Sequence, residues 1–391
     1  MHPASDDDDL SALETPALVY DQSLIEAQLK LFARVRDISG ARLLYSIKAQ
    51  PFFGLLKLMA PALEGFSVSS LFEARLASEI MQARPEHGGA IHLTTPGLRD
   101  AEIDELGRLC SAISFNSLEQ CQRGLSRLNP SIEAGIRVNP ELSVLGDDRY
   151  DPCRPRSKLG VPLESFAAAL RDDKRLAHRL TGIHFHTQFE TRTPEPLQAT
   201  LDKIENVLAG PLEHLQWLNI GGGYLPRNEA DAVALGEVIR GFRERHALSV
   251  WIEPGKALIG AAGSLVTRVV DCFHRNSQAI AVLDTGVHHL PEVFEYQKSP
   301  QLREHHPDGA YSWLLVGSTC LAGDVFGEYR FSKPLVVGAR LCFEQVGAYS
   351  LIKASRFNGY DLPTIHLRDR GGTLRLMRAF GYADYHRQWS A

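Results

Sequence analysis

The sequence predicts an α/β protein in which a (β/α)8 barrel is followed by an all-β domain. Over about the first two-thirds of the 391 residues, short apolar runs alternate with amphipathic stretches, as in a succession of βα units. After Gly260 the apolar runs are short, and turn signals such as Asn358-Gly359 and Gly371-Gly372 separate them. Eight βα units over roughly 250 residues is the usual size of such a barrel.

The elements of the barrel are predicted from the spacing of apolar residues, which differs between strands and amphipathic helices. The expected strands are apolar runs of strand length, at 42–47, 65–69, 90–94, 111–115, 132–138, 181–186, 215–220 and 249–253. The expected helices are the amphipathic stretches between them, at 22–39, 70–83, 98–109, 117–127, 194–208 and 228–246. Asp21 or Ser23 is expected to cap the first helix. The barrel is therefore expected to occupy residues 22–260.

The all-β domain is expected to occupy residues 261–391. Its strands are predicted from short apolar runs bounded by turns, at 262–271, 278–283, 312–316, 340–346, 348–354, 364–368 and 373–377. An isolated apolar run, Pro16-Ala17-Leu18-Val19-Tyr20, precedes the barrel. We expect a strand over residues 14–21 to join the second domain.

Composition and charge argue against several classes of protein. A net charge of −5 without a basic arm does not indicate nucleic-acid binding. No apolar run approaches the ~18 residues of a membrane span. The N-terminus, with its run Asp6–Asp9, lacks the parts of a signal peptide. The six cysteines show neither a CxxC pair nor metal-ligand spacing, so we expect free thiols in a reducing cytoplasm and no bound metal.

Three segments at strand ends suggest a cofactor. Lys48 follows the first barrel strand, Gly221-Gly222-Gly223 follows the seventh, and Glu253-Pro254-Gly255-Lys256 follows the eighth. The functional face of such barrels lies at these strand ends, and phosphates often bind in the loops after strands seven and eight. An amine that can form a Schiff base, backbone amides for a phosphate and a carboxylate for a ring nitrogen are what pyridoxal phosphate (PLP) requires.

Two further motifs carry reactive side chains. In Ile183-His184-Phe185-His186 the period of a strand places both histidines on one face. They could stack on a cofactor ring, bind a metal, or form a hydrogen-bonded core pair. In the loop 317–324 of the second domain, Cys320 and Asp324 could supply a proton donor and an amine anchor, or form an ordinary turn with a buried cysteine.

Taken in order, these motifs resemble the fold-type III PLP-dependent decarboxylases, the alanine-racemase-like group that includes ornithine and diaminopimelate decarboxylases. The resemblance runs from about Thr15 to about Asp369. It rests on YSIKAQ, FSVSSLFEARLA, GIRVNP, SKLG, GIHFHT, WLNIGGGY, IEPGKA, GSTCLAGDVFGEY and AYSLIKASRFNGY. GIHFHT, TCLAGDVFG and FNG resemble the carboxynorspermidine/carboxyspermidine branch, which implies decarboxylation of a carboxylated polyamine or a related amino acid.

The resemblance implies roles in the barrel. Lys48 would carry PLP as a Schiff base, His186 would stack on its ring, and Glu253 would face the ring nitrogen. Arg137 and Asn139, at the end of the fifth strand, would line the pocket. The phosphate would be held by residues of two loops, Gly221, Gly222, Gly223, Gly255 and Lys256.

It also implies roles in the second domain. Cys320 would come from the partner subunit of a homodimer with shared active sites and protonate the α-carbon after CO2 leaves. Asp324 would bind the distal amine of the substrate, and Tyr349 would contact the phosphate. A further loop would contribute substrate contacts from His289, Glu292 and Glu295.

The chain departs from the family pattern in three places. Lys256 stands where the family tends to have a non-basic residue, and segment 187–190 differs from its usual sequence. Gln297 and Lys298 occupy the place of an expected arginine after Tyr296. These departures concern the substrate more than the cofactor, so a paralogue that acts on another diamino acid or carboxylated amine is the alternative.

Three other functions remain open at this stage. A catalytically silent regulator of this fold would typically lose the lysine or the phosphate loop, and both are present. A metal-dependent barrel hydrolase would use His184 and His186 and would need further ligands, for which His92 is a weak candidate. A PLP racemase would need a second base on the opposite face of the ring, and the loop of Cys320 and Asp324 is more like that of the decarboxylases.

Overall fold

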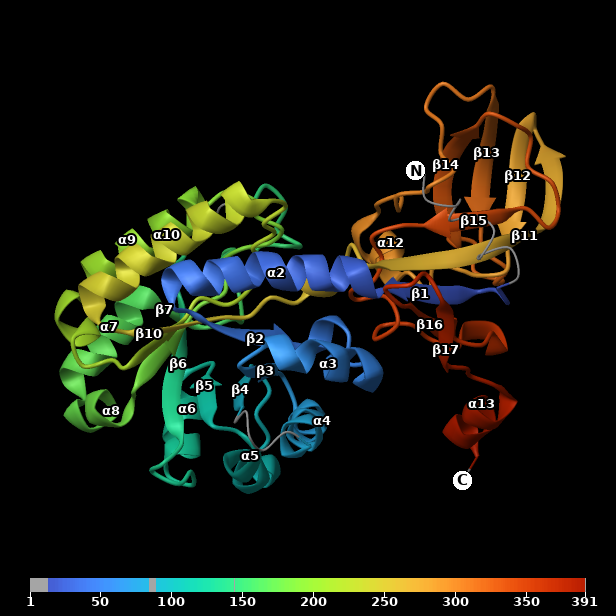
Figure 1. The fold of residues 1–391 in the computed structure, drawn as a ribbon. Helices are drawn as coiled ribbons and strands as arrows, with labels where there is room; N and C mark the ends of the chain where they lie inside the picture. The colour runs from blue at the N-terminus through green and yellow to red at the C-terminus, as the bar shows by residue number, and fades with distance from the viewer. Residues whose placement is uncertain (1–12, 84–88, 144, 391) are drawn as a thin grey trace. The chain divides into compact units, whose positions relative to one another are not determined.

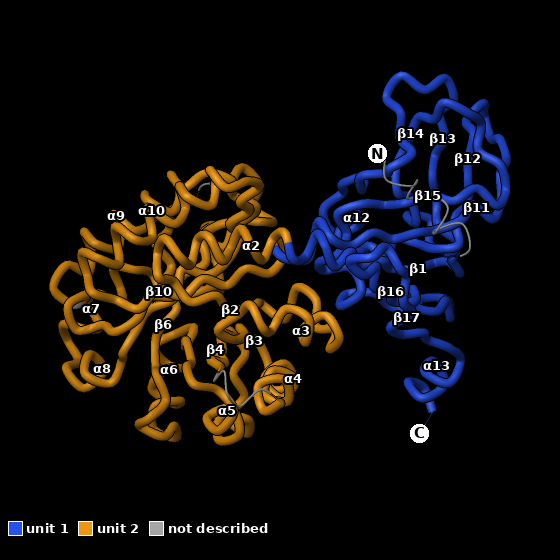
Figure 2. The backbone as a smooth tube through the Cα atoms, in the orientation of Figure 1, with its two compact units in different colours: residues 1–26, 258–391 blue, residues 27–257 orange. Residues whose placement is uncertain are grey.

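The computed structural model describes residues 13–83, 89–143 and 145–390. It divides into two compact units (Figures 1 and 2). Unit 2 comprises residues 27–257, and unit 1 combines the described part of residues 1–26 with residues 258–391.

Unit 2 is a closed parallel barrel. In the described part of the chain its eight strands are β2 (Arg42–Ser46), β3 (Gly65–Val68), β4 (Ala90–Thr95), β5 (Ala112–Phe115), β6 (Glu133–Asn139), β8 (Gly182–His184), β9 (Trp217–Asn219) and β10 (Ser249–Ile252). Pairing of β10 with β2 and of β5 with β6 closes the ring. The two-residue strand β7 (Val161–Pro162) extends the sheet beside β6. The barrel predicted from the sequence is therefore confirmed.

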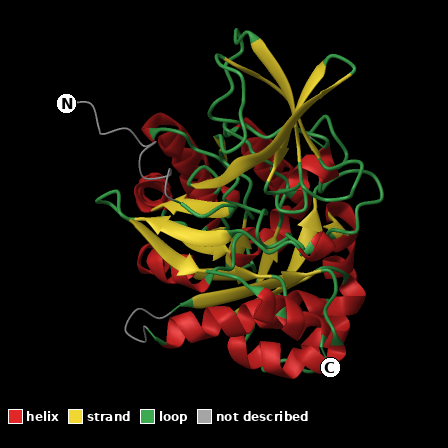
Figure 3. Ribbon diagram, turned by 90° about the vertical axis from the view of Figure 1, so that its right-hand side faces the viewer, coloured by secondary structure: helices red, strands yellow, loops and turns green. Residues whose placement is uncertain are grey.

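Helices lie outside the barrel strands (Figures 1 and 3). They are α2 (Gln22–Ser39), α3 (Phe53–Met59), α4 (Leu71–Gln82), α5 (Ile103–Leu109), α6 (Leu118–Leu125), α7 (Leu163–Asp172), α8 (Lys174–Arg179), α9 (Glu195–Leu212), α10 (Glu229–His246) and α11 (Lys256–Ile259). Asp21 caps α2, since its Oδ1 accepts hydrogen bonds from the amides of Ser23 and Leu24 at 2.8 and 3.1 Å. Within the described ranges, no helix is both long and apolar enough to span a membrane.

The barrel interior is filled by aromatic side chains. Trp217 and Trp251 stack with their ring centroids 5.0 Å apart. Both are buried and belong to one apolar cluster with Leu44 and Ala112. Because these residues come from β2, β5, β9 and β10, the cluster lies between strands on different sides of the ring. The barrel is thus a packed core rather than a channel.

Unit 1 contains a mixed sheet of β1 (Ala17–Asp21), β11 (Gly263–Arg275), β12 (Gln278–Leu283), β13 (Tyr311–Val316), β14 (Val325–Phe331), β15 (Arg340–Phe343), β16 (Thr364–Arg368) and β17 (Leu374–Arg378). β1 lies between β11, to which it is antiparallel, and β16, to which it is parallel. The described part of the unit also has two short helices, α12 (Pro291–Tyr296) and α13 (Tyr382–Trp389). The sheet-rich second domain predicted from the sequence is therefore confirmed.

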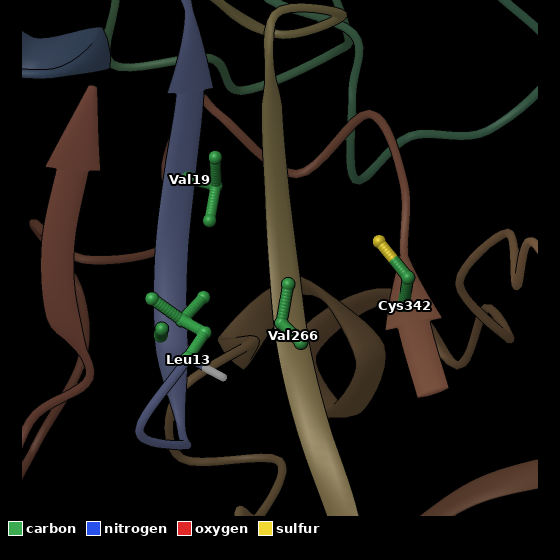
Figure 4. Close-up of a cluster of buried hydrophobic side chains, with 5 residues drawn as sticks. Leu13, Val19, Val266 and Cys342 are labelled. Carbon is green, nitrogen blue, oxygen red and sulfur yellow. The ribbon is translucent and has the colours of Figure 1, made fainter. Parts of the chain in front are cut away.

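A small apolar cluster fixes β1 in this sheet. Val19 of β1 and Val266 of β11 are buried together with Leu13, Ala17 and Cys342 (Figure 4). Burying a side chain of this size stabilises the fold by about 1.5–3 kcal/mol. The N-terminal strand is consequently part of the core of unit 1.

Some expectations from the sequence were wrong. Residues 348–354 form turns rather than a strand, and Tyr349 has a φ of +60°, which a strand does not accommodate. Strand β14 was not predicted, because Gly327, with a φ of +138°, interrupts its apolar alternation. Strand β8 ends at His184, so His186 lies in the loop beyond it rather than on the strand.

Candidate active site

Lys48 lies at the carboxyl end of β2, on the short 3-10 helix η1 (Ile47–Ala49). The amide of Ser46 donates a hydrogen bond to the carbonyl of Pro254 at 3.1 Å, which ties the end of β2 to the loop after β10. Gly255 of that loop packs closely against η1, because a Cβ there would lie 3.1 Å from the Cβ of Ala49. The loop of Glu253 thus fixes the position of Lys48.

The Lys48 amine has a lowered pKa. Desolvation by the surrounding protein atoms is the main cause, although the side chain is partly exposed, and the charge of Arg137 adds to it. The carboxylates of Glu253 and Glu73 act in the opposite direction. More of this amine is therefore unprotonated and nucleophilic at neutral pH than in an ordinary lysine.

Polar side chains of three adjacent strands form one layer inside the barrel. Arg137 of β6 is the register partner of His184 in β8, and His184 is the partner of Asn219 in β9. All three are buried. Desolvation lowers the pKa of Arg137 to about 10 and that of His184 well below its usual value. Asn139, also buried, accepts a hydrogen bond from the amide of Glu141 at 2.9 Å and so shapes the turn after β6.

Glu253, which follows β10, is a buried carboxylate that contacts this layer. Its Oε1 accepts a hydrogen bond from Nδ2 of Asn219 at 2.6 Å, and its Oε2 lies 4.0 Å from Nε2 of His184. Burial raises the pKa of Glu253, while Lys48 and hydrogen bonds from Asn219 and Ser67 oppose the shift. A carboxylate held among cationic and donor groups can serve a protonated ring nitrogen.

The glycine turn after β9 is closely packed on both sides. A Cβ at Gly222 would lie 2.3 Å from the carbonyl oxygen of Glu253, and one at Gly223 would lie 2.1 Å from that of Gln188. Gly221 and Gly223 have φ values of +65° and +94°, which favour glycine. The amide of Gly222 donates to Nδ1 of His186 at 3.1 Å. The turn therefore connects the loop that carries His186 to the loop that carries Glu253.

Lys256 lies beside this turn in an ion pair. Its Nζ is 2.6 Å from Oε1 of Glu190, a residue with a φ of +52° in the loop after β8. The amide of Thr191, next in the chain, donates to the carbonyl of Gly223 at 2.8 Å. The charge of Lys256 is thus shared with Glu190, which the sequence did not indicate.

In unit 1, Asp324 joins two loops. Its Oδ1 accepts a hydrogen bond from the amide of Val287 at 2.7 Å, and its Oδ2 accepts from the amide and Oγ1 of Thr319 at 3.1 and 2.5 Å. Asp324 is only 3% exposed. Cys320, in contrast, is an exposed free thiol whose amide donates to Oδ1 of Asn358 at 2.9 Å. The asparagine of the FNG motif thus holds the thiol loop.

The other predicted residues of unit 1 lie around the same loops. His289 is buried, with Nδ1 2.9 Å from Oγ1 of Thr285, and its Nε2 has no hydrogen-bond partner among the described residues. Glu295 pairs with Lys353 at 2.6 Å, and the Lys353 ammonium lies 5.5 Å from the ring centroid of Tyr349. Glu292 is half-buried in the first turn of α12.

Sequence reasoning missed three residues of the barrel site. Asn219 lies in the motif WLNIGGGY, and a polar residue within an apolar strand is a signal that could have identified it. His92 was considered only as a weak metal ligand. Glu73 has an ordinary helix-capping pattern that does not indicate a role in the site. Ser70 caps α4, and the Glu73 carboxylate accepts a hydrogen bond from the amide of Ser69 at 2.7 Å. Burial raises the pKa of Glu73, and Lys48 opposes this shift.

The barrel residues fit PLP. The site combines an amine of lowered pKa, a buried carboxylate, and a glycine turn too tight for any Cβ. In addition, Nε2 of His184 is buried and has no hydrogen-bond partner among the described residues, since the nearby Glu253 carboxylate lies 4.0 Å away. The residues fit a metal ion less well. The described part of the chain contains no group of three or more histidine, cysteine, aspartate or glutamate side chains that could hold one.

Comparisons with known proteins agree with this arrangement. The profile of a family described as "Pyridoxal-dependent decarboxylase, C-terminal sheet domain" matches residues 17–347. A carboxyaminopropylagmatine decarboxylase of Synechocystis is 35% identical over 96% of this chain and 95% of its own length. A carboxynorspermidine/carboxyspermidine decarboxylase of Campylobacter jejuni is 31% identical over 95% of this chain and 98% of its own.

A solved structure is similar over nearly the whole chain. The crystal structure of carboxynorspermidine decarboxylase from Campylobacter jejuni, complexed with norspermidine, superimposes with a TM-score of 0.86 and 29% sequence identity. The match covers 96% of this chain and 100% of that structure.

Proposed function

Because this chain belongs to the pyridoxal-dependent decarboxylase family, we propose that it removes the α-carboxylate of a carboxylated polyamine as CO2. The observation that carries the substrate class is the pair of relatives above 30% identity over at least 95% of the chain, both named for such substrates. One name specifies an agmatine-derived and the other a spermidine-like compound. The shared chemistry is an α-amino acid whose far end is cationic.

Residues of unit 2 would hold the cofactor. PLP, when bound, accepts the electrons that the departing CO2 leaves at the substrate α-carbon. Lys48 would supply the amine for its covalent attachment, His186 would pack on its ring, and Glu253 would meet the ring nitrogen. Gly221, Gly222, Gly223 and Gly255 would bind the phosphate. Lys256 would add positive charge there, reduced by its ion pair with Glu190.

The substrate side of the site is proposed to involve Arg137 and Asn139 in the barrel and the loops of unit 1. Cys320 is the proposed proton donor, which its exposed free thiol supports, whereas Asp324 is the candidate for the distal cation. Tyr349 is proposed to contact the phosphate. Three further residues are proposed to line the path of the substrate, namely His289, Glu292 and Glu295. The reaction is proposed to occur in the cytoplasm, where exposed thiols stay reduced.

We expect a homodimer in which Cys320 reaches the Lys48 site of the partner. Mixing Lys48→Ala chains with Cys320→Ala chains, each inactive or weakly active alone, should then restore one intact site per heterodimer. Random pairing makes half of the dimers heterodimers, so activity should recover to about a quarter of the wild-type value. Native mass spectrometry verifies that mixed dimers form. Mixed dimers without recovered activity would mean that one chain builds each site.

Replacing Asp324 with asparagine should lower kcat/KM for a cationic substrate by about 10- to 100-fold. A charge-assisted hydrogen bond to an ammonium contributes about 1.5–3 kcal/mol, and about 1.36 kcal/mol corresponds to a factor of ten. PLP binding should be unchanged. Thr319→Val is the matched control, because it removes one hydrogen bond to Asp324 and keeps the charge. An equal loss in both variants would show that Asp324 only braces its loop.

A substrate panel tests the proposed function itself. Purified protein loaded with PLP should release CO2 from carboxylated polyamines, including an agmatine-derived one, faster than from diaminopimelate, ornithine or arginine. The reverse preference would assign the chain to the alternative, a paralogue for a diamino acid. Release of CO2 from none of them, with PLP bound, would favour the racemase or regulator.

A further inference from the structure

A chain of hydrogen bonds crosses the barrel interior and ends at Glu253. Oγ of Ser114 lies 2.7 Å from Nε2 of His92, and Nδ1 of His92 lies 2.6 Å from Nδ2 of Asn219. The same Nδ2 lies 2.6 Å from Oε1 of Glu253. The exposed fractions of these four residues are 1%, 0%, 0% and 5% in that order. Bulk water therefore cannot replace a missing partner within this chain.

The geometry determines where the protons lie. The amide of Gly221 donates to Oδ1 of Asn219 at 2.8 Å, so the carboxamide oxygen is accounted for and Nδ2 must face both His92 and Glu253. An amide nitrogen carries two hydrogens and accepts none. Nδ1 of His92 is consequently an acceptor, and its single proton lies on Nε2, facing Ser114. Desolvation lowers the pKa of His92 to about 3, in agreement with a neutral ring.

We propose that His92 is a positioning residue for Glu253: by accepting the second amide hydrogen of Asn219, it holds the first on the Glu253 carboxylate. The proposal rests on the proposed function only in that Glu253 serves the cofactor ring. Other groups act on Glu253 as well, namely Lys48, Arg137, Ser67 and His184. His92 itself lies beside Glu253, with Nδ1 3.5 Å from Oε1. A neutral ring without a proton on Nδ1 cannot donate to the carboxylate, so His92 acts on it through Asn219.

The surroundings of His92 make this acceptor hard to replace. Its ring makes T-shaped contacts with Trp217 and Trp251, with centroid separations of 5.3 and 5.0 Å. Without the Nδ1 acceptor, one amide hydrogen of Asn219 would face only apolar atoms, which is costly for a buried donor. The amide would turn away from Glu253 to find a partner. The carboxylate form would then lose a donor, and its protonated form would become relatively more stable.

His92→Phe tests the proposal, because phenylalanine is of similar shape and has no acceptor. In the apo-protein, the Glu253 carboxyl band, followed by infrared difference spectroscopy and assigned with Glu253→Gln, should titrate about one to two pH units higher than in the wild type. His92→Gln, which retains an acceptor, should recover part of the shift. Ser114→Ala, which leaves Nδ1 of His92 in place, should shift the titration least.

Activity and cofactor binding give an independent measurement. In His92→Phe, kcat should fall about tenfold or more while KM stays within about twofold, since the substrate contacts are unchanged. The absorbance of bound PLP should change its pH dependence in the same direction as the Glu253 titration. If the wild type takes up no PLP, the proposed function is wrong, while the Glu253 titration still tests the role of His92.

Two results would overturn the proposal. One is a folded His92→Phe protein whose Glu253 titrates as in the wild type. The other comes from a second variant, used if His92→Phe does not fold. Asn219→Asp keeps the shape of the side chain and places an acceptor where the Nδ2 donor stood. This variant should raise the pH midpoint of the Glu253 titration at least as much as His92→Phe is expected to. An unchanged midpoint would contradict the role proposed for the hydrogen-bond chain from His92 through Asn219 to Glu253.

Discussion

Lys48→Ala is expected to abolish CO2 release and to leave the barrel folded. Removal of the covalent nucleophile from an enzyme typically lowers kcat on the order of 10^4- to 10^6-fold. The fold should persist because Lys48 is exposed on the short helix η1 and contributes little buried apolar area. Thermal unfolding of the two apo-proteins should therefore agree within a few degrees.

Reduction with borohydride shows whether the lost activity reflects lost attachment of PLP. Wild-type protein should carry the cofactor mass on the peptide that contains Lys48, and the variant should carry none there. Lys57→Ala is the matched control, since Lys57 is an exposed lysine of the neighbouring helix α3. Cofactor attached to Lys256 instead, or normal turnover by Lys48→Ala, would remove Lys48 from the mechanism.

Glu253→Gln is expected to lower kcat by about 10^2- to 10^3-fold. A preorganised charge in a water-poor site typically has this effect on the rate, and Glu253 is a buried carboxylate that acts on the charge of Lys48 and accepts a hydrogen bond from Asn219. Glutamine keeps the shape and can still accept the hydrogen bond from Asn219. The loss should therefore come from the charge rather than from disturbed packing, and the unfolding midpoint should stay near that of the wild type.

The same variant has a defined pH signature. The negative charge of Glu253 raises the pKa of Lys48 and partly offsets the desolvation that lowers it. Removing the charge should lower this pKa further, so acylation of Lys48 in the apo-protein should reach half its maximal rate at a lower pH. Glu73→Gln should act in the same direction by a smaller amount. A shift to higher pH in Glu253→Gln would contradict the assigned electrostatics.

The barrel could be predicted because each βα unit leaves a local signal. The helix over 22–39 and the strand over 42–47 coincide with α2 and β2 to within one residue, since Asp21 supplies the cap. Predictions failed where the conformation of a single residue sets the direction of the backbone. The apolar run 348–354 reads as a strand, but Gly347 is packed so tightly that a Cβ would lie 2.1 Å from the carbonyl of Ile259, and Tyr349 follows with positive φ.

The site was predictable in its covalent chemistry and less so in its hydrogen bonding. Lys48 and Glu253 follow strands, where barrel chemistry is expected. The link from His92 through Asn219 to Glu253 joins residues far apart in the sequence, and no spacing rule connects them. The Lys256–Glu190 pair depends on the positive φ of Glu190, which its residue type does not indicate.

The place of β1 has a consequence for how the protein is made. During synthesis residues 17–21 leave the ribosome before the barrel segment, but their partners in β11 and β16 begin only at residues 263 and 364. The whole barrel segment, 27–257, is complete before either partner exists. The nascent chain must therefore keep an unpaired apolar strand available while the barrel folds, and an exposed strand of this kind is open to aggregation. Chaperone binding early in translation should accordingly depend on residues 17–21.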